Sequence, residues 1–133
     1  MELRTNQHSV FRLNYHLIMC IKYRREVLNA EISEYLREIF VKISNSYNIT
    51  LVEWEHDKDH VHCLFEAHPK SELSKFINAY KSASSRLVKK AFPELKNSLW
   101  KDSFWSQSFC LMTVGGAPLS VVKEYIQTQG QPK

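Results

Sequence analysis

The sequence is short of the residues that build cross-linked or repetitive proteins. Its 133 residues include only three glycines, four prolines and three cysteines. The cysteines, Cys20, Cys63 and Cys110, are odd in number and widely spaced, so neither a disulfide framework nor a Cys-x-x-Cys metal knuckle is expected. This cysteine usage is typical of a reducing compartment, and we expect a cytoplasmic protein.

Long apolar runs and long polar runs are both missing. No apolar stretch reaches the roughly 18 residues of a membrane-spanning helix, and the polar segment from Met1 to Gln7 has no signal-peptide pattern. We therefore expect no membrane association. The hydrophobic content of 44% is enough for a buried core. Because no repeat or linker divides the chain, residues 1–133 are predicted to form a single domain.

Basic residues are gathered in two stretches of a chain whose net charge is +4. The first stretch contains Lys22, Arg24 and Arg25. The second, between residues 70 and 101, includes Lys81, Arg86, Lys89 and Lys90. Both are interleaved with Tyr23, Tyr80 and Trp100. Basic side chains that contact phosphates and aromatic rings that stack on bases are typical of a nucleic-acid-binding surface. A solvated helix face explains the charges equally well.

The spacing of apolar residues predicts an α+β protein. Strands are predicted over residues 10–21, 49–55, 60–66 and 104–113. Helices are predicted over 31–47, from Ser71 as cap to Pro93, and from Pro118 to about Gln129. This order is that of the ferredoxin-like or RRM-like βαββαβ fold. We expect a four-stranded antiparallel sheet with two helices on one face, plus a C-terminal helix that carries Tyr125.

His60-Val61-His62 is the most informative triplet in the sequence. Side chains alternate along a strand, so His60 and His62 share one face, about 7 Å apart, while Val61 and Cys63 point to the other. Two imidazoles placed in this way can share one metal ion. The alternative is a pair of surface or hydrogen-bonded histidines. Asp59, just before the strand, is expected to be a solvated turn acid, and orientation of a histidine is its alternative role.

The last predicted helix offers a third ligand and a nucleophile. Tyr125 and Gln129 are spaced i and i+4, which puts them on one helical face. A glutamine oxygen suits Mg²⁺ or Mn²⁺, and a tyrosine can form a covalent intermediate. The same residues also fit the packing face of an amphipathic helix.

Several motifs follow one another in an order that resembles a known family. They are Tyr15-His16, Lys22-Tyr23-Arg24-Arg25, Asp59-His60-Val61-His62, the helix containing Lys81 to Leu87, Phe92-Pro93, Trp105-Ser106, and Lys123-Glu124-Tyr125-Ile126 with Gln129. Together they resemble the single-tyrosine transposases of the smallest insertion sequences, of the 200/605 type, in the His-hydrophobic-His (HUH) nuclease superfamily. The sequence departs from that pattern at Gln107 and Ser108, where such proteins often have a basic residue and a glycine.

The resemblance implies a metal-dependent nuclease that also rejoins DNA. Tyr125 would attack single-stranded DNA and form a 5′-phosphotyrosine link, with Mg²⁺ or Mn²⁺ on His60, His62 and Gln129. It implies a DNA hairpin near the end of the element as the bound structure. It also implies a homodimer with composite active sites. In each site, Tyr125 would work together with the histidines of its own chain or with those of the partner chain. The DNA contacts expected from the basic surface are Lys22, Arg24, Arg25, Lys81, Arg86, Lys89 and Lys90.

Three other functions remain open on the sequence. A non-catalytic RRM-like module would share the fold, but residues 60–66 lack the basic-glycine-aromatic run of such domains. A zinc hydrolase or structural zinc protein is disfavoured because there is no His-Glu-x-x-His motif and Cys63 is expected to face away from the histidines. A domesticated relative that processes repeated hairpins would use the same chemistry.

Overall fold

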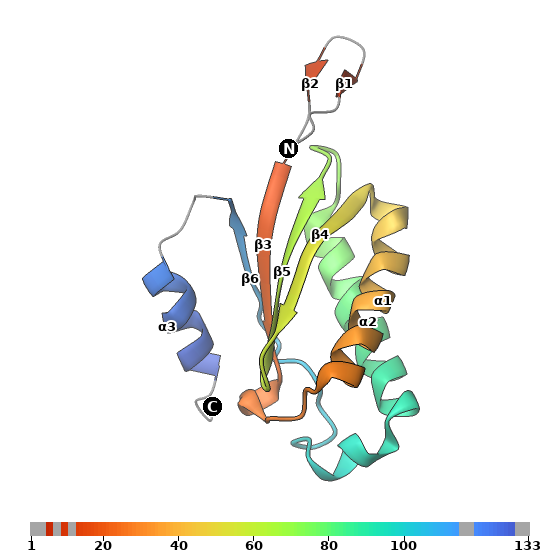
Figure 1. The fold of residues 1–133 in the computed structure, drawn as a ribbon, viewed down its shortest axis with the longest axis vertical. Helices are drawn as coiled ribbons and strands as arrows, with labels where there is room; N and C mark the ends of the chain where they lie inside the picture. The colour runs from red at the N-terminus through yellow and green to blue at the C-terminus, as the bar shows by residue number, and fades with distance from the viewer. Residues whose placement is uncertain (1–4, 7–8, 11–12, 115–118, 130–133) are drawn as a thin grey trace.

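The computed structural model describes residues 5–6, 9–10, 13–114 and 119–129. Its central feature is an antiparallel sheet of four strands in the order β4-β5-β3-β6. The strands are β3 (Leu13–Cys20), β4 (Ile49–His56), β5 (His60–Ala67) and β6 (Cys110–Thr113). The helices are α1 (Ala30–Ser44), α2 (Leu73–Ala91) and α3 (Leu119–Gln129). Helices α1 and α2 lie together on one side of the sheet, and α3 lies apart from them, beside β6 (Figure 1).

The strand order confirms the predicted ferredoxin-like arrangement, because the first and third strands of the βαββαβ unit, β3 and β5, occupy the centre of the sheet. The two strands pair over their full length, from Leu13 opposite Ala67 to Cys20 opposite His60. Helix α1 begins where the sequence supplies a cap, since the Asn29 side chain accepts a hydrogen bond of 2.9 Å from the Ile32 amide. Among the described residues, no helix combines the length and apolar character that crossing a bilayer requires.

The last strand of the sheet is shorter than predicted. The sequence favours residues 104–113, but β6 covers only Cys110–Thr113. Phe104 and Trp105 are both buried, with their rings in edge-on contact at 4.8 Å. The Trp105 indole donates a hydrogen bond of 2.9 Å to Ser84 of α2. Because two successive side chains enter the core, this stretch cannot alternate as a strand does.

Other expectations near element ends also need correction. Ser71 does not cap α2; its hydroxyl donates to the Tyr47 carbonyl, and Glu72 stands before the helix without a side-chain cap. Of the predicted first strand, Val10 belongs to β2 (Ser9–Val10), which pairs with β1 (Thr5–Asn6), and residues 13–20 form β3, while residues 11–12 lie outside the described residues. Residues 115–118, which include Gly115-Gly116 and Pro118, lie outside the described residues.

The core lies between the sheet and helices α1 and α2. It takes alternate residues from the central strands, among them Leu17, Met19, Val61, Cys63 and Phe65. Tyr80 of α2, expected at a nucleic-acid surface, is fully buried there and donates a hydrogen bond of 3.0 Å to the Leu36 carbonyl. Because successive strand residues face opposite sides, the core places His16, His60 and His62 on the other face of the sheet.

Candidate active site

His60 is oriented by a carboxylate that the sequence did not predict to be buried. Asp59 is only 7% exposed, and its Oδ1 lies 2.8 Å from Nδ1 of His60. Its other oxygen accepts a hydrogen bond of 2.8 Å from Nε of Arg24. The expectation that Asp59 is a solvated acid in a turn is therefore wrong, because Asp59 lies at the centre of a chain of side-chain contacts from Arg24 to Asp59 to His60. A carboxylate on Nδ1 fixes the His60 tautomer that leaves Nε2 with a free lone pair.

Arg24 reaches Asp59 from a turn with an unusual backbone. Tyr23 and Arg24, in the short 3-10 helix η1 (Lys22–Arg24), have φ angles of 54° and 52°. Left-handed backbone costs roughly 1–2 kcal/mol per non-glycine residue. The Tyr23 ring packs edge-on against Trp100 at 5.0 Å, which together with the Arg24–Asp59 ion pair holds the turn. The turn therefore places Arg24, which was predicted to bind DNA, beside Asp59 at the histidine site.

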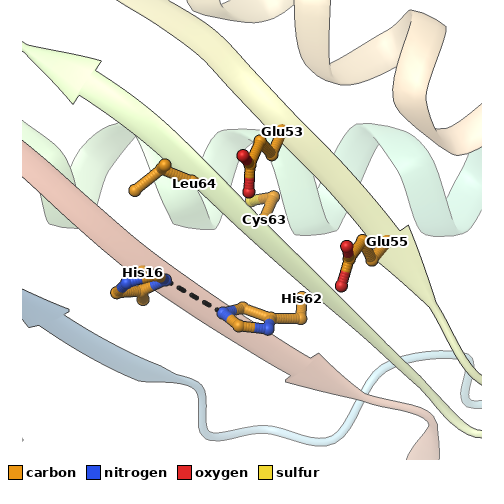
Figure 2. Close-up of a pocket in the computed structure, with 6 residues that line it drawn as sticks. All are labelled: His16, Glu53, Glu55, His62, Cys63 and Leu64. Carbon is orange, nitrogen blue, oxygen red and sulfur yellow. Dashed lines mark hydrogen bonds between the residues drawn. The ribbon is translucent and has the colours of Figure 1, made fainter. Parts of the chain in front are cut away.

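A third histidine, His16, lies beside His62, although the sequence pattern did not assign it to the site. Nε2 of His62 lies 3.0 Å from Nδ1 of His16 on the neighbouring strand. The two rings line a small pocket together with Glu53, Glu55 and Leu64 (Figure 2). Partial burial, and then the proximity of His16, lower the pKa of His62, so its ring is neutral and able to act as a ligand.

The two glutamates reach this pocket because of an irregularity in β4. The register between β4 and β5 shifts between Leu51 and Glu53. An extra residue in one strand reverses the alternation of the residues that follow it. Glu53 and Glu55 consequently lie opposite Leu64 and His62 on the histidine face, while Leu51 packs against the core.

Tyr125 and Gln129 are hydrogen-bonded to two serines of their own chain. The hydroxyls of Ser106 and Ser108 both donate to Oε1 of Gln129, that of Ser108 at 3.1 Å. Ser108 Oγ also lies 3.3 Å from the Tyr125 hydroxyl. Burial raises the pKa of Tyr125 to about 12, the hydrogen bond between Tyr125 and Ser108 lowers it, and the nearby thiols of Cys20 and Cys110 raise it further. The phenol therefore keeps its proton at neutral pH in this position.

The side-chain hydrogen bonds of the predicted site residues fall into two sets, one on the sheet and one on α3. His60 and His62 share one face of β5 as predicted, and Tyr125 and Gln129 share one face of α3. Within the parts of the chain that the structure describes, no group of three His, Cys, Asp or Glu side chains lies close enough to hold a metal ion. His16 shares the histidine face because it alternates with Tyr15 and Leu17 along β3. Only the strand order, which sets β3 beside β5, makes it a neighbour of His62.

The basic residues predicted to bind DNA differ in their surroundings. Lys22 lies over the rings of Tyr23 and Trp100, 5.1 and 5.9 Å from their centroids. Lys81 and Lys89 donate to backbone carbonyls. The exposed members of the set are Arg25, Arg86 and Lys90. Their role in DNA binding stays a prediction.

Comparison with known proteins gives a consistent result. Residues 9–129 match the family model described as "Transposase IS200 like". The chain is 35% identical to the ISDra2 transposase TnpA of Deinococcus radiodurans over 129 residues, which are 97% of this chain and 92% of that protein. It is 30% identical to the transposase for insertion sequence element IS200 of Salmonella typhimurium over 122 residues, 92% of this chain and 80% of that one.

Solved structures show the same likeness. A crystal structure of a candidate transposase from Deinococcus radiodurans R1 superposes with a TM-score of 0.83 at 32% identity, covering 97% of this chain and 99% of the other. A REP-associated tyrosine transposase, solved with a REP hairpin bound to it, has a TM-score of 0.57 at 13% identity, over 95% of this chain and 68% of the other. The second likeness concerns the fold alone.

Proposed function

The chain belongs to the IS200-like transposases, and we propose that it cleaves and rejoins single-stranded DNA through Tyr125, with a divalent ion bound by His60, His62 and Gln129. The observation that carries this proposal is the geometry of His60. Its Nδ1 is held by the buried Asp59, and its neighbour His62 lies on the same face of β5. A carboxylate behind a histidine is the usual support of a metal ligand.

The donor set can hold Mg²⁺ or Mn²⁺, because it combines two imidazoles with a hard amide oxygen. Cys63, which lies between His62 and Leu64 in the sequence, is buried on the opposite face of β5. His62 Nε2 would exchange its contact with His16 for the ion, and Gln129 Oε1 would exchange its contacts with the two serines. When bound, the ion would polarise the scissile phosphate and stabilise the charge that develops there.

Tyr125 would supply the nucleophile. Its phenolic oxygen forms a bond to phosphorus while the bond from phosphorus to the 3′ oxygen breaks, which leaves a 5′-phosphotyrosine and a free 3′-hydroxyl. Attack by another 3′-hydroxyl reverses the exchange and rejoins DNA without ATP, because the phosphotyrosyl ester conserves the energy of the original ester. Burial raises the pKa of Tyr125 to about 12, so the phenol keeps its proton beside Ser108 and needs a base to remove it. We propose that α3 also moves, so that Tyr125 leaves Ser108 and reaches the scissile phosphate.

A hairpin in single-stranded DNA is the proposed substrate. The hairpin-bound relative supports this choice by its fold, and the exposed Arg25, Arg86 and Lys90 supply cations for phosphates. Lys22, together with the rings of Tyr23 and Trp100, forms a further surface on which an unpaired base could stack. We propose a homodimer in which each site is completed by α3 of one of the two chains.

The decisive experiment captures the covalent intermediate. Labelled single-stranded hairpin DNA and Mg²⁺ should give a protein–DNA adduct on a denaturing gel, and mass spectrometry should map it to Tyr125. The Tyr125→Phe variant should bind the hairpin as the original protein does and give no adduct. An adduct that persists in this variant, or that maps to another residue, would overturn the assignment. Binding without any adduct over a range of DNA ends would favour a non-catalytic module.

A further inference from the structure

Lys81 makes contacts that differ from those expected of a DNA-binding lysine. Its ammonium donates to the carbonyls of Ser106 at 2.7 Å and Gln107 at 2.9 Å, and lies 3.5 Å from that of Ser108. It also lies 5.7 Å from the centroid of the Phe109 ring. An ammonium has three donors, so these three successive carbonyls can occupy all of them. Burial lowers the pKa of Lys81, which is consistent with a cation turned toward protein rather than water.

The segment that Lys81 holds is the one that contacts α3. The Ser106 amide donates to the Cys20 carbonyl at 2.8 Å, and Ser106 is 4% exposed, so the segment is also fixed to β3. The hydroxyls of Ser106 and Ser108, which we call the serine seat, receive Gln129 and Tyr125. A rigid backbone on one side and two hydroxyls on the other make the seat a defined binding position for α3.

We propose that Lys81 is a positioning residue that holds the serine seat, and that the seat keeps Tyr125 and Gln129 of the same chain in a resting position. A carbonyl oxygen has two lone pairs, and the two serines occupy both on Gln129 Oε1. The seat therefore competes with any cation for this oxygen. Only this last consequence rests on the proposed function, since the seat itself is independent of any reaction.

The position of Lys81 on α2 supports this role. Arg86 and Lys90 of the same helix are exposed, whereas Lys81 is directed at the segment that follows Trp105. Hydrogen bonds to a charged group are stronger than those between neutral groups. Loss of the ammonium would leave three carbonyls without their common donor. The seat would then lose its fixed geometry, although the sheet and the core would stay in place.

Hydrogen exchange of the α3 amides, measured without DNA or added metal, tests the seat directly. Lys81→Met should speed this exchange by about 10-fold, as the loss of roughly 1.4 kcal/mol of local stability requires. Lys90→Met removes the same charge from the same helix and should leave α3 exchange unchanged. Ser108→Ala and the double variant Ser106→Ala/Ser108→Ala should speed exchange as well. In the double variant, adding Lys81→Met should change exchange little further, because Lys81 acts through the seat.

Each outcome decides the matter. If Lys81→Met leaves α3 exchange unchanged and instead lowers the salt dependence of DNA binding, Lys81 is a phosphate contact and the proposal is wrong. If Lys81→Met fails to fold, the serine variants provide the test. Unchanged hydrogen exchange of α3 in the double variant would then show that the two serines do not hold α3. A Mn²⁺ titration separates the two proposals. Removal of both hydroxyls should raise Mn²⁺ affinity several-fold, and faster exchange without that rise would count against Gln129 as a ligand but not against the seat.

Discussion

The two halves of the site are built in different ways. In the sheet half, His16, His60 and His62 stand on the two central strands, which pair over eight residues, and Asp59 ties His60 to Arg24. In the helix half, Tyr125 and Gln129 are hydrogen-bonded to two serine hydroxyls, and α3 contacts the turn η1. Moving a histidine would require the sheet to be opened, whereas moving α3 would require these side-chain hydrogen bonds and its packing contacts to be exchanged.

This difference suits the proposed chemistry. Metal ligands have to be held in a fixed geometry, and central strands provide that. The nucleophile has to lose a proton that it keeps in its present position, and the glutamine oxygen has to exchange one set of partners for another. We therefore expect substitutions in the sheet half to change metal affinity, and substitutions in the helix half to change how often α3 leaves its seat.

The largest effect in the sheet half is expected for His62→Ala. This substitution removes one of the two proposed imidazole ligands, so cleavage should fall by more than the 10- to 100-fold that loss of a residue supporting a ligand typically causes. Adduct yield at saturating Mn²⁺ measures the change. His56→Ala is a matched control, because His56 is an exposed histidine of the neighbouring strand β4. Full cleavage by the His62 variant would show that the ion is held elsewhere.

Asp59→Asn should have an intermediate effect. An amide is a weaker acceptor for His60 Nδ1 than a carboxylate, and Arg24 would lose its ion partner. We expect metal affinity to fall about 10- to 100-fold, with the fold retained. Calorimetric titration with Mn²⁺ provides the measurement, and Asp57→Asn, in the exposed part of the same turn, provides the control. Equal affinities of the two variants would mean that Asp59 has no role in the metal site.

His16→Ala should act in the opposite direction. His16 occupies Nε2 of His62, and this contact has to break before that nitrogen can bind an ion. A neutral hydrogen bond contributes about 0.5–1.5 kcal/mol, so metal affinity should rise by about 2- to 10-fold when it is removed. The same Mn²⁺ titration decides the sign. A fall in affinity would indicate that His16 is itself a ligand, which would give the sheet half three histidine ligands.

The sequence predicted what depends on local pattern. The alternation of His60, Val61 and His62 gave the shared face, and the order of elements gave the sheet. It could not predict contacts that depend on tertiary structure. The burial of Asp59 requires Arg24 to fold back through a left-handed turn, and the His16–His62 contact requires β3 to lie beside β5. The late start of β6, at Cys110 instead of Phe104, follows from two successive buried aromatics, which a strand pattern cannot accommodate.

The smallest expected effect lies outside both halves. Arg86 and Lys90 are exposed on α2, the helix that packs on the face of the sheet opposite the histidines. Replacing both with glutamine should weaken hairpin binding and lower the slope of log affinity against log salt by about 0.7 for each single-strand phosphate that the protein no longer neutralises. Metal affinity and the adduct yield at saturating DNA should not change, because these depend on the two halves of the site. Lys42→Gln on the exposed surface of α1 is the control for charge alone. If the double variant keeps the original salt slope, the DNA lies over another surface, and the cluster formed by Lys22, Tyr23 and Trp100 is the next to test.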